Sequence, residues 1–549
     1  MSGIAGPAVS DRMKYGIKQS AVRSDNLLHN FKASNGRSFD VKLGNEIVFE
    51  IPAMGKGYYC DLATSYIRFG LRVTTSSDLT NANNATGSVR FARGPESLFR
   101  RLQIQDASGG LLETIENYND LYAVTELCCN SSTKRKGLGR FHGEGWAAHR
   151  VASVVQTAPI AGTPTQSTVR HFPLRFLPDL GSALYADATF AMDDTTEGDI
   201  NGTMSTAPVT DTTTNTYDLV FTINTLSAIF GGGAEKYLPM SAINGVRLTF
   251  SLDDFRNAFV VAGYGINFTS GTHATELAKF QASIYDPTYF LNMVQVDPMV
   301  DAELIAAATY ANRNPFENPQ DADAEEGGFI RIHTQGWQTF QAHVANGTTA
   351  MEHVIPVRVS SLKAIYFAFT PNTDYTGLES YDHEYNATSP QGIGNAMKST
   401  FKNPNLADYV FYIDGKPTPA TNVLIEKPYS EAISELQRSW HLAHKSAGTD
   451  HLSLLAGELP MYDFENRNFI MGQEFESFSG KGAVIESGKN TLNSNLQLRL
   501  RFGTDGALYT AMGEALDTND KTDFELKVFC LHDQFLTIEP NTGVMRTEL

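Results

Sequence analysis

Three histidines late in the chain have the side chains and the spacing that a metal site could use. His441 and His444 are three residues apart, which places them on one side of a helix, and His451 follows closely. Imidazole binds zinc and copper, but such sites also need further ligands and groups that orient the rings. No carboxylate or thiol pattern accompanies these histidines, so we expect them to be surface or interface residues without a metal.

Other motifs that could carry chemistry are equally sparse. Cys128 and Cys129 are adjacent, and no second pair follows at the spacing of a zinc site. Asp253 and Asp254 end an expected strand, where a turn explains them better than a glycosidase pair does. The sequence contains neither a phosphate-binding Gly-Lys-Ser/Thr loop nor a Gly-x-Ser-x-Gly elbow. We therefore expect no enzymatic activity and no cofactor.

The composition describes a folded protein with an acidic surface. Of the 549 residues, 42% are hydrophobic and 19% charged, which excludes extensive disorder, and the length suggests two or more domains. The net charge of −18 argues against a surface that coats nucleic acid. We find neither a signal peptide nor an apolar run of membrane-spanning length, so we expect synthesis in the cytosol and four free cysteines.

Alternation of apolar and polar residues is the dominant pattern and predicts strands that bury one face. It is clearest at Ile67–Val73, Val246–Leu252, Leu496–Phe502 and Phe524–Val528. Helical periodicity is rare, and its best examples are Leu111–Leu127 and Ser430–His444. Strands separated by long loops, with few helices, indicate an all-β sandwich class.

The order of these elements repeats along the chain. Each half contains a strand, a turn, a helix, an alternating strand and a closing hydrophobic strand pair. We place a first domain at 39–296 and a second, with a C-terminal tail, at 327–549. The segment 297–326 is a linker, acidic and Pro-containing, with a short helix possible at Val300–Tyr310. A coincidental repetition within one large β domain is the alternative.

Several segments together resemble the double-jelly-roll major capsid proteins of tailless icosahedral double-stranded DNA viruses, especially those of virophages and polinton-like viruses. The segments are Ser97–Leu127, Tyr237–Leu252, Tyr409–Leu442, Phe464–Phe478, Ser487–Phe502 and Phe524–Pro540. Each is weak alone, and their common order carries the resemblance. It implies two tandem eight-stranded jelly-roll β-sandwiches with a few short helices.

The resemblance also implies a structural role in the virion. Three copies would form a homotrimer with six jelly rolls, a pseudo-hexameric capsomer that tiles an icosahedral shell. The implied partners are neighbouring trimers, penton proteins and minor capsid proteins. The alternatives are a minor vertex or spike protein of the virion and a carbohydrate-binding β-sandwich protein.

A basic arm precedes the first domain. Residues 1–38 hold six Lys or Arg residues and two Asp residues. In a shell, Arg12, Lys14, Lys18 and Arg23 could contact the inner face or a neighbouring subunit, and through them the arm could reach an inner membrane or the packaged genome. A featureless disordered terminus is the alternative.

Overall fold

The computed structural model describes twelve stretches of the chain. They are residues 24–75, 88–91, 94–129, 215–231, 236–262, 280–311, 328–371, 401–446, 469–476, 488–504, 506–507 and 523–548. Everything below concerns these residues. The four basic arm residues Arg12, Lys14, Lys18 and Arg23 lie outside them.

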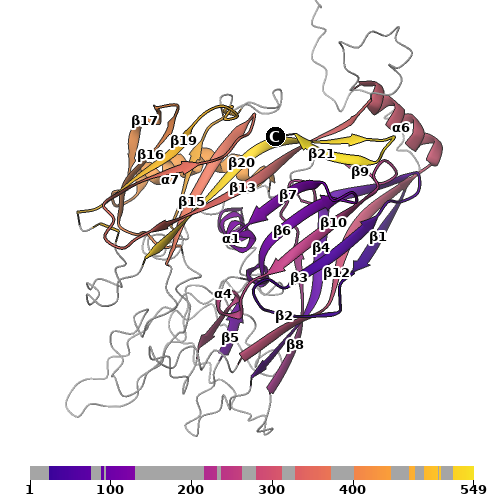
Figure 1. The fold of residues 1–549 in the computed structure, drawn as a ribbon, viewed down its shortest axis with the longest axis horizontal. Coiled ribbons are helices and arrows are strands. Elements are labelled where there is room, and N and C mark those ends of the chain that lie inside the picture. Colours follow the sequence, from indigo (N-terminus) through magenta and orange to yellow (C-terminus); the bar gives the residue numbers. More distant parts are fainter. Residues whose placement is uncertain are drawn as a thin grey trace, which may run out of the picture.

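The first sandwich packs two antiparallel sheets face to face (Figure 1). One sheet has the order β1-β12-β4-β8, with the short strands β2 and β9 beside it, and the other has the order β3-β10-β6-β7. The bounds are β1 Ser24–Lys32, β2 Ser38–Asp40, β3 Glu46–Pro52, β4 Tyr58–Thr75, β6 Phe99–Asp106, β7 Leu111–Glu116, β8 Asn215–Asn224, β9 Leu238–Pro239, β10 Gly245–Leu252 and β12 Phe280–Val296. A separate ribbon pairs β5 Ser88–Phe91 with β11 Phe259–Ala262, and the short helices η2 Pro95–Leu98 and α4 Phe255–Ala258 lie beside it.

The second sandwich has the same plan. Its sheets have the orders β13-β20-β15-β18 and β14-β19-β16-β17. The bounds are β13 Ile330–Val344, β14 Ala350–Ile355, β15 Leu362–Pro371, β16 Leu406–Ile413, β17 Lys416–Leu424, β18 Ile470–Glu474, β19 Leu496–Phe502 and β20 Phe524–Glu539. The last strand, β21 Val544–Glu548, pairs with β20.

Strand order identifies the two sandwiches as two copies of one topology. Numbered by position within its own sandwich, each principal strand of the first has an equivalent in the second, from β1 and β13 to β12 and β20. A helix follows the fifth principal strand in both: α1 Tyr118–Cys129 follows β7, and α7 Ser430–Ser446 follows β17. Two eight-stranded jelly rolls in tandem are therefore confirmed, and so is the all-β class.

Two predictions about local structure were wrong. Leu111–Leu127 is not one helix, because Leu111–Glu116 forms β7 and pairs with β6 along its length. Asn117, with φ of 51°, breaks the chain direction before α1 begins. The range 1–38 is not all arm either, because the backbone of β1 pairs with β12 from Ser24 onward.

The linker helix is confirmed and firmly held. Helix α6, Pro298–Ala311, follows β12, and its Asp301 is 1% exposed. The Asp301 carboxylate accepts hydrogen bonds from Gly57 N (2.9 Å), Tyr59 Oη (2.8 Å) and Ser241 Oγ (3.2 Å). A carboxylate with three donors is well satisfied, so α6 is anchored to the first sandwich at its N-terminal turn.

The two sandwiches meet at a junction to which each contributes a different part of its fold. Strand β7 of the first lies against β13 and β21 of the second, and helix α1 lies against helix α7 (Figure 1). Across the junction, Thr339 Oγ1 donates to Glu116 O (2.7 Å), and Lys527 forms an ion pair with Asp120. Buried apolar residues form one continuous cluster through the junction, so the two cores are in contact.

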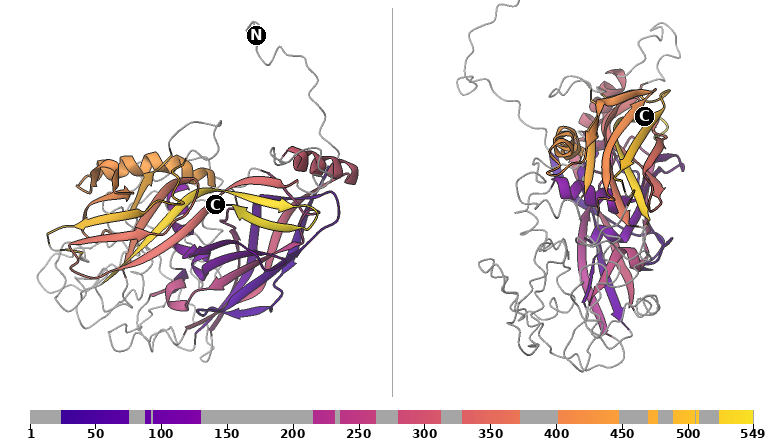
Figure 2. Two further views of the ribbon diagram at one scale, coloured as in Figure 1. Left: turned by 45° about the horizontal axis from the view of Figure 1, so that its top comes forward. Right: turned by 90° about the vertical axis from the view of Figure 1, so that its left-hand side faces the viewer.

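The C-terminal strands lie over this junction. Figure 2 shows β20 and β21 reaching from the second sandwich across the first. Thr547 Oγ1 donates to Leu112 O (3.0 Å), and Asn244 Nδ2 donates to Thr542 O (2.6 Å). Met545 is buried there. The end of the second sandwich therefore helps to fix the first.

Strand β17 forms one edge of its sheet, and its sequence reduces the risk of pairing with a further strand. Among the described strands it pairs with β16 alone, and it contains Pro417 and Pro419. Proline has no amide hydrogen, so this edge offers fewer donors to a further strand.

The junction ion pair gives a stability prediction. Both side chains are largely buried, so Lys527→Met leaves the Asp120 carboxylate without its cation and costs about 3 kcal/mol of unfolding free energy. The double variant K527M D120N is expected to lose less than the sum of the single losses, as denaturant titration would show. As a control, Arg499→Met removes an exposed pair with Glu352 and should cost less than about 1 kcal/mol. Equal losses in the two methionine variants would contradict this assignment.

Candidate functional site

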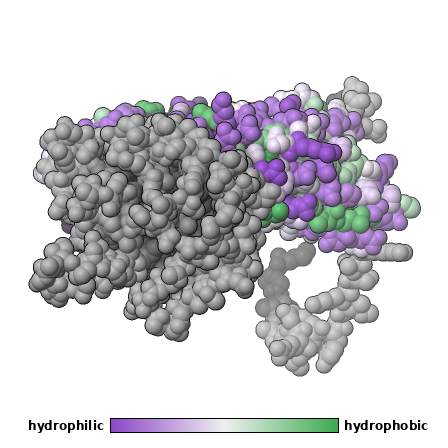
Figure 3. Space-filling view, turned by 90° about the horizontal axis from the view of Figure 1, so that it is seen from below, coloured by the Kyte–Doolittle hydropathy of each residue, from purple (hydrophilic) through white to green (hydrophobic). Residues whose placement is uncertain are grey.

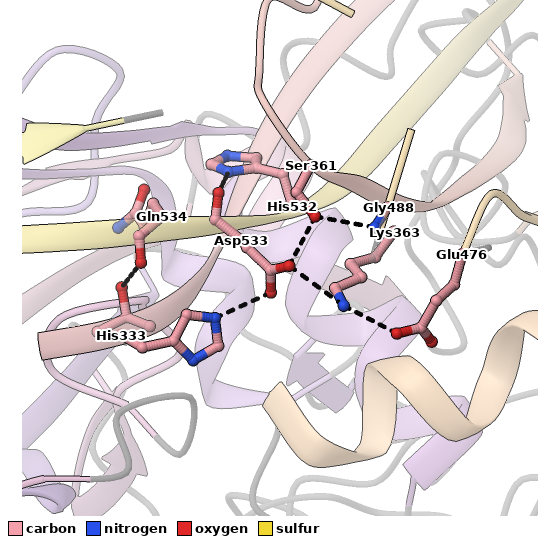
Figure 4. Close-up of polar contacts among 9 residues, drawn as sticks. His333, Ser361, Lys363, Glu476, Gly488, His532, Asp533 and Gln534 are labelled. Carbon is pink, nitrogen blue, oxygen red and sulfur yellow. Dashed lines mark hydrogen bonds and ion pairs between the residues drawn. The ribbon is translucent and has the colours of Figure 1, made fainter. Parts of the chain in front are cut away.

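A group of buried ionisable side chains lies in the second sandwich (Figure 4). At its centre is Asp533 of β20, which is 1% exposed. Around it are His333 of β13, Ser361 and Lys363 at the start of β15, and Glu476 just after β18. We call these five residues the polar cluster. Four separate segments of the chain meet in it.

Hydrogen bonds account for the centre of the cluster. The Asp533 carboxylate accepts from Ser361 Oγ (2.6 Å) and lies 3.1 Å from Lys363 Nζ and 3.1 Å from His333 Nε2. Lys363 Nζ also donates to Glu476 Oε1 (2.8 Å). Each charge has an opposite charge or a donor beside it, which a buried charge requires.

These contacts set the protonation of Asp533. Burial by itself would raise its pKa, but hydrogen bonds from His333 and Ser361 and the charge of Lys363 outweigh that effect and hold the pKa at about 2. The neighbouring His532 is fully buried, and desolvation lowers its pKa to about 4, although its hydrogen bond to the Asp533 carbonyl and the Asp533 charge oppose the shift. At neutral pH, therefore, Asp533 is ionised and His532 is neutral.

The arrangement fits a structural role better than a catalytic one. A serine nucleophile needs a base that takes its proton, usually a histidine. Here the Ser361 hydroxyl donates to Asp533, whose low pKa makes it a poor base, and His333 lies on the other side of that carboxylate. The polar cluster instead ties β13, β15 and β20 to the segment after β18.

A second buried carboxylate performs a similar task in the first sandwich. Glu113 of β7 accepts hydrogen bonds from Ser227 Oγ (2.6 Å) and from Ala228 N (2.9 Å). Desolvation raises its pKa, and these hydrogen bonds oppose the shift. Glu113 thus fastens the segment that follows β8 to the middle of β7.

The structure tests only some of the residues singled out in the sequence. Asp253 accepts hydrogen bonds from Asp254 N (2.7 Å) and Asn257 Nδ2 (2.9 Å), which confirms the turn. Cys60 and Cys530 are free and buried. The side chains of His441 and His444, on α7, lie outside the described residues, as does His451.

The described residues contain neither a metal-binding group nor a membrane-spanning helix. No group of three or more His, Cys, Asp or Glu side chains there could hold a metal ion. None of the described helices is both long enough and apolar enough to cross a membrane. Sequence reasoning missed the polar cluster, whose one local signal is the polar run His532–Gln534 inside the hydrophobic strand β20.

The lowered pKa of His532 predicts a pH dependence of stability. Between about pH 4 and 6.5 the unfolded chain binds a proton at this residue that the folded chain does not, so stability falls as the solution is acidified through this range. His532→Asn should remove on the order of 2 kcal/mol of that change. Urea titrations at several pH values measure it. The exposed His343, replaced by Asn, serves as the control, and an unchanged pH profile in His532→Asn would refute the assignment.

Comparison with known structures identifies the fold. A quasi-atomic model of the PBCV-1 virus capsid matches with a TM-score of 0.52 at 10% identity, covering 97% of this chain and 98% of that one. The 3.5 Å cryo-EM structure of the Sputnik virophage matches with a TM-score of 0.51 at 10% identity, covering 100% of this chain and 93% of that one. No protein-family model and no curated protein matches the sequence. The likeness read from the sequence is thus confirmed at the level of the fold: this chain folds as the capsid proteins of PBCV-1 and Sputnik do.

Proposed function

We propose that this chain is the major structural protein of an icosahedral virion. Three copies form a homotrimer whose six jelly rolls give a pseudo-hexagonal outline, and such trimers tile the shell. The observation that carries the proposal is the duplication within one chain. The two sandwiches share their strand order and the position of their helix. The match to the PBCV-1 capsid model covers 97% of this chain and 98% of that one. Two similar modules per chain provide six similar walls per trimer.

The remaining expectations are part of the same proposal. The protein acts as a building block and not as an enzyme, it is made in the host cytoplasm, and it resides in the virion. Its partners are neighbouring trimers, penton proteins and minor capsid proteins. The polar cluster supports this role, because tied strands give a module that keeps its shape under lateral contact.

The oligomeric state tests the proposal directly. Size-exclusion chromatography with light scattering should give three times the 60.2 kDa chain mass, and negative-stain images should show flat particles of hexagonal outline. A monodisperse monomer that binds sugars would favour a carbohydrate-binding protein. An elongated particle would favour a vertex or spike protein.

We also propose that the basic arm contacts the inner side of the shell through Arg12, Lys14, Lys18 and Arg23. There it could meet an inner membrane, the genome or an acidic surface of a neighbouring trimer. Because β1 begins at Ser24 and belongs to the first sandwich, the proposed arm is residues 1–23.

Deleting residues 1–23 should leave the trimer intact and lower the yield of closed particles. The physical reason is that the truncation removes charges and no described strand. Replacing the four basic residues by Gln keeps the length of the arm and removes only its charge, so it distinguishes the effect of the charge from the effect of the chain length. Trimers are counted by light scattering and particles by electron microscopy. Normal particle yields from both variants would eliminate the arm's role.

A further inference from the structure

One side of helix α6 is held against the first sandwich. Asp301 accepts the three hydrogen bonds described above. Ile305 and Ala308, four and seven residues further along, are partly buried against the hydrophobic core. This spacing follows one side of a helix, so these three residues mark the inner side of α6.

The outer side of α6 is apolar, which is unusual for a helix surface that meets solvent. Met299 is 77% exposed and Leu304 is 50% exposed. The single exposed charge among the described side chains of this helix is Glu303. We give the name apolar side of α6 to five exposed residues: Met299, Ala302, Leu304, Ala306 and Ala307.

Much of the described surface has a different composition. Seen from below, this part of the molecule is mostly hydrophilic, and its apolar patches are small (Figure 3). Single exposed apolar residues are normal on a protein surface, whereas a contiguous group of them marks a site of interaction. We therefore expect another segment or molecule to cover the apolar side of α6.

The N-terminal arm enters the fold beside this helix. Ser24, the first residue of β1, pairs with Val296, and α6 begins two residues later at Pro298. Figure 1 shows α6 at this end of the first sandwich. A helix of this length extends about 21 Å, and an arm of residues 1–23 would extend about 35 Å even if it were coiled as tightly as a helix. The arm is therefore long enough to lie along the whole of α6.

The arm and the helix are complementary in charge. Residues 1–23 hold four bases and one acid. At α6 the exposed charges are both acidic: Glu303, and Asp297, which also caps the helix at Met299 N (2.8 Å). The arm also contains apolar residues that are suited to cover a helix, namely Ile4, Val9, Met13, Ile17 and Val22.

Charge disfavours two other occupants of the same surface. Residues 312–327, which follow α6, hold five acids and one base, so Glu303 and Asp297 would repel them. The same two carboxylates would repel an anionic bilayer. The basic arm is attracted where both of these are repelled.

We propose that residues 1–23 of each chain pack on the apolar side of its own helix α6, with bases of the arm against Asp297 and Glu303. This inference rests on the proposed role of the arm and adds a contact within the chain. Two acids leave two of the four bases for the contacts proposed above. Because the arm is attached two residues from the helix, its effective concentration there is high, which favours the same chain over a second copy.

Oxidation of Met299 tests the contact, because methionine oxidation follows the exposure of the side chain. Hydrogen peroxide is the probe, and peptide mass spectrometry measures the rate of sulfoxide formation in the full chain and in the chain that lacks residues 1–23. Met299 should be oxidised about fivefold faster or more in the truncated chain, since fivefold protection corresponds to an arm that is bound about 80% of the time. Met351 of β14, in the second sandwich, is the control, and its rate should not change.

A charge reversal on the helix separates the two parts of the contact. In the full chain, Glu303→Lys should raise the Met299 rate toward that of the truncated chain, because the arm then meets a like charge. In the truncated chain the same substitution should leave the rate unchanged. Circular dichroism confirms that each variant is folded.

Zero-length cross-linking identifies the chain that supplies the arm. A carbodiimide joins a lysine amine to a carboxylate that it contacts, with loss of water, so Lys14 or Lys18 should be linked to Glu303. Mass spectrometry should find this linked peptide in the monomer band of a denaturing gel. Its presence only in a dimer band would assign the arm to a second copy and overturn the inference.

Three further results would also overturn the inference. Met299 could be oxidised rapidly in both chains, which would show that nothing covers it, or slowly in both, which would show that something other than the arm does. Protection that appears only when phosphatidylserine vesicles are added would assign the apolar side of α6 to a bilayer. The proposed function is decided separately, by the mass of the trimer and by the yield of closed particles.

Discussion

A β-sandwich buries one face of each of its sheets, and a large apolar surface on an outer face must be covered by something else. This constraint governs the second sandwich. All ten residues of β15 are buried, although only alternate side chains can point into the core between the sheets. The outward-facing side chains of β15 lie toward α7, while β13 of the same sheet packs against β7 of the first sandwich. The second module is therefore complete only as part of the whole chain, and the junction is a condition of its stability.

Polar contacts at the junction make the packing of the two sandwiches specific. Apolar contact alone would allow the two sandwiches to slide, whereas Lys527 with Asp120 and Thr339 with the Glu116 carbonyl fix one register. Inside the second sandwich, Asp533 does the same for four segments that are far apart in sequence. In both places the buried charge is tolerated because its partners are present. Any arrangement that separates the charge from its partners is destabilised, because the charge would be buried alone.

Alternation of side chains predicted the strands well, because burial of one face leaves a direct mark on the sequence. Val246–Leu252 and Leu496–Phe502 were found as strands in this way, and they are equivalent in the two modules. Leu111–Glu116 was misread as helical because Leu111, Ile115 and Tyr118 also fit a helical period, and only pairing with β6 decides the matter. The polar cluster could not be predicted. His333, Lys363 and Asp533 are brought together by strand pairing across the whole domain, and each looks like an ordinary polar residue in its local sequence.

The prolines of β17 have a consequence for how copies of this chain can meet. An open edge strand invites a neighbour to extend the sheet, and a chain with such an edge is at risk of growing into an endless ribbon. Pro417 and Pro419 remove amide donors from that edge, at the end of the molecule that lies farthest from the first sandwich. Association there must rely on side chains, which can encode a particular partner and angle, and not on the backbone, which would accept any strand.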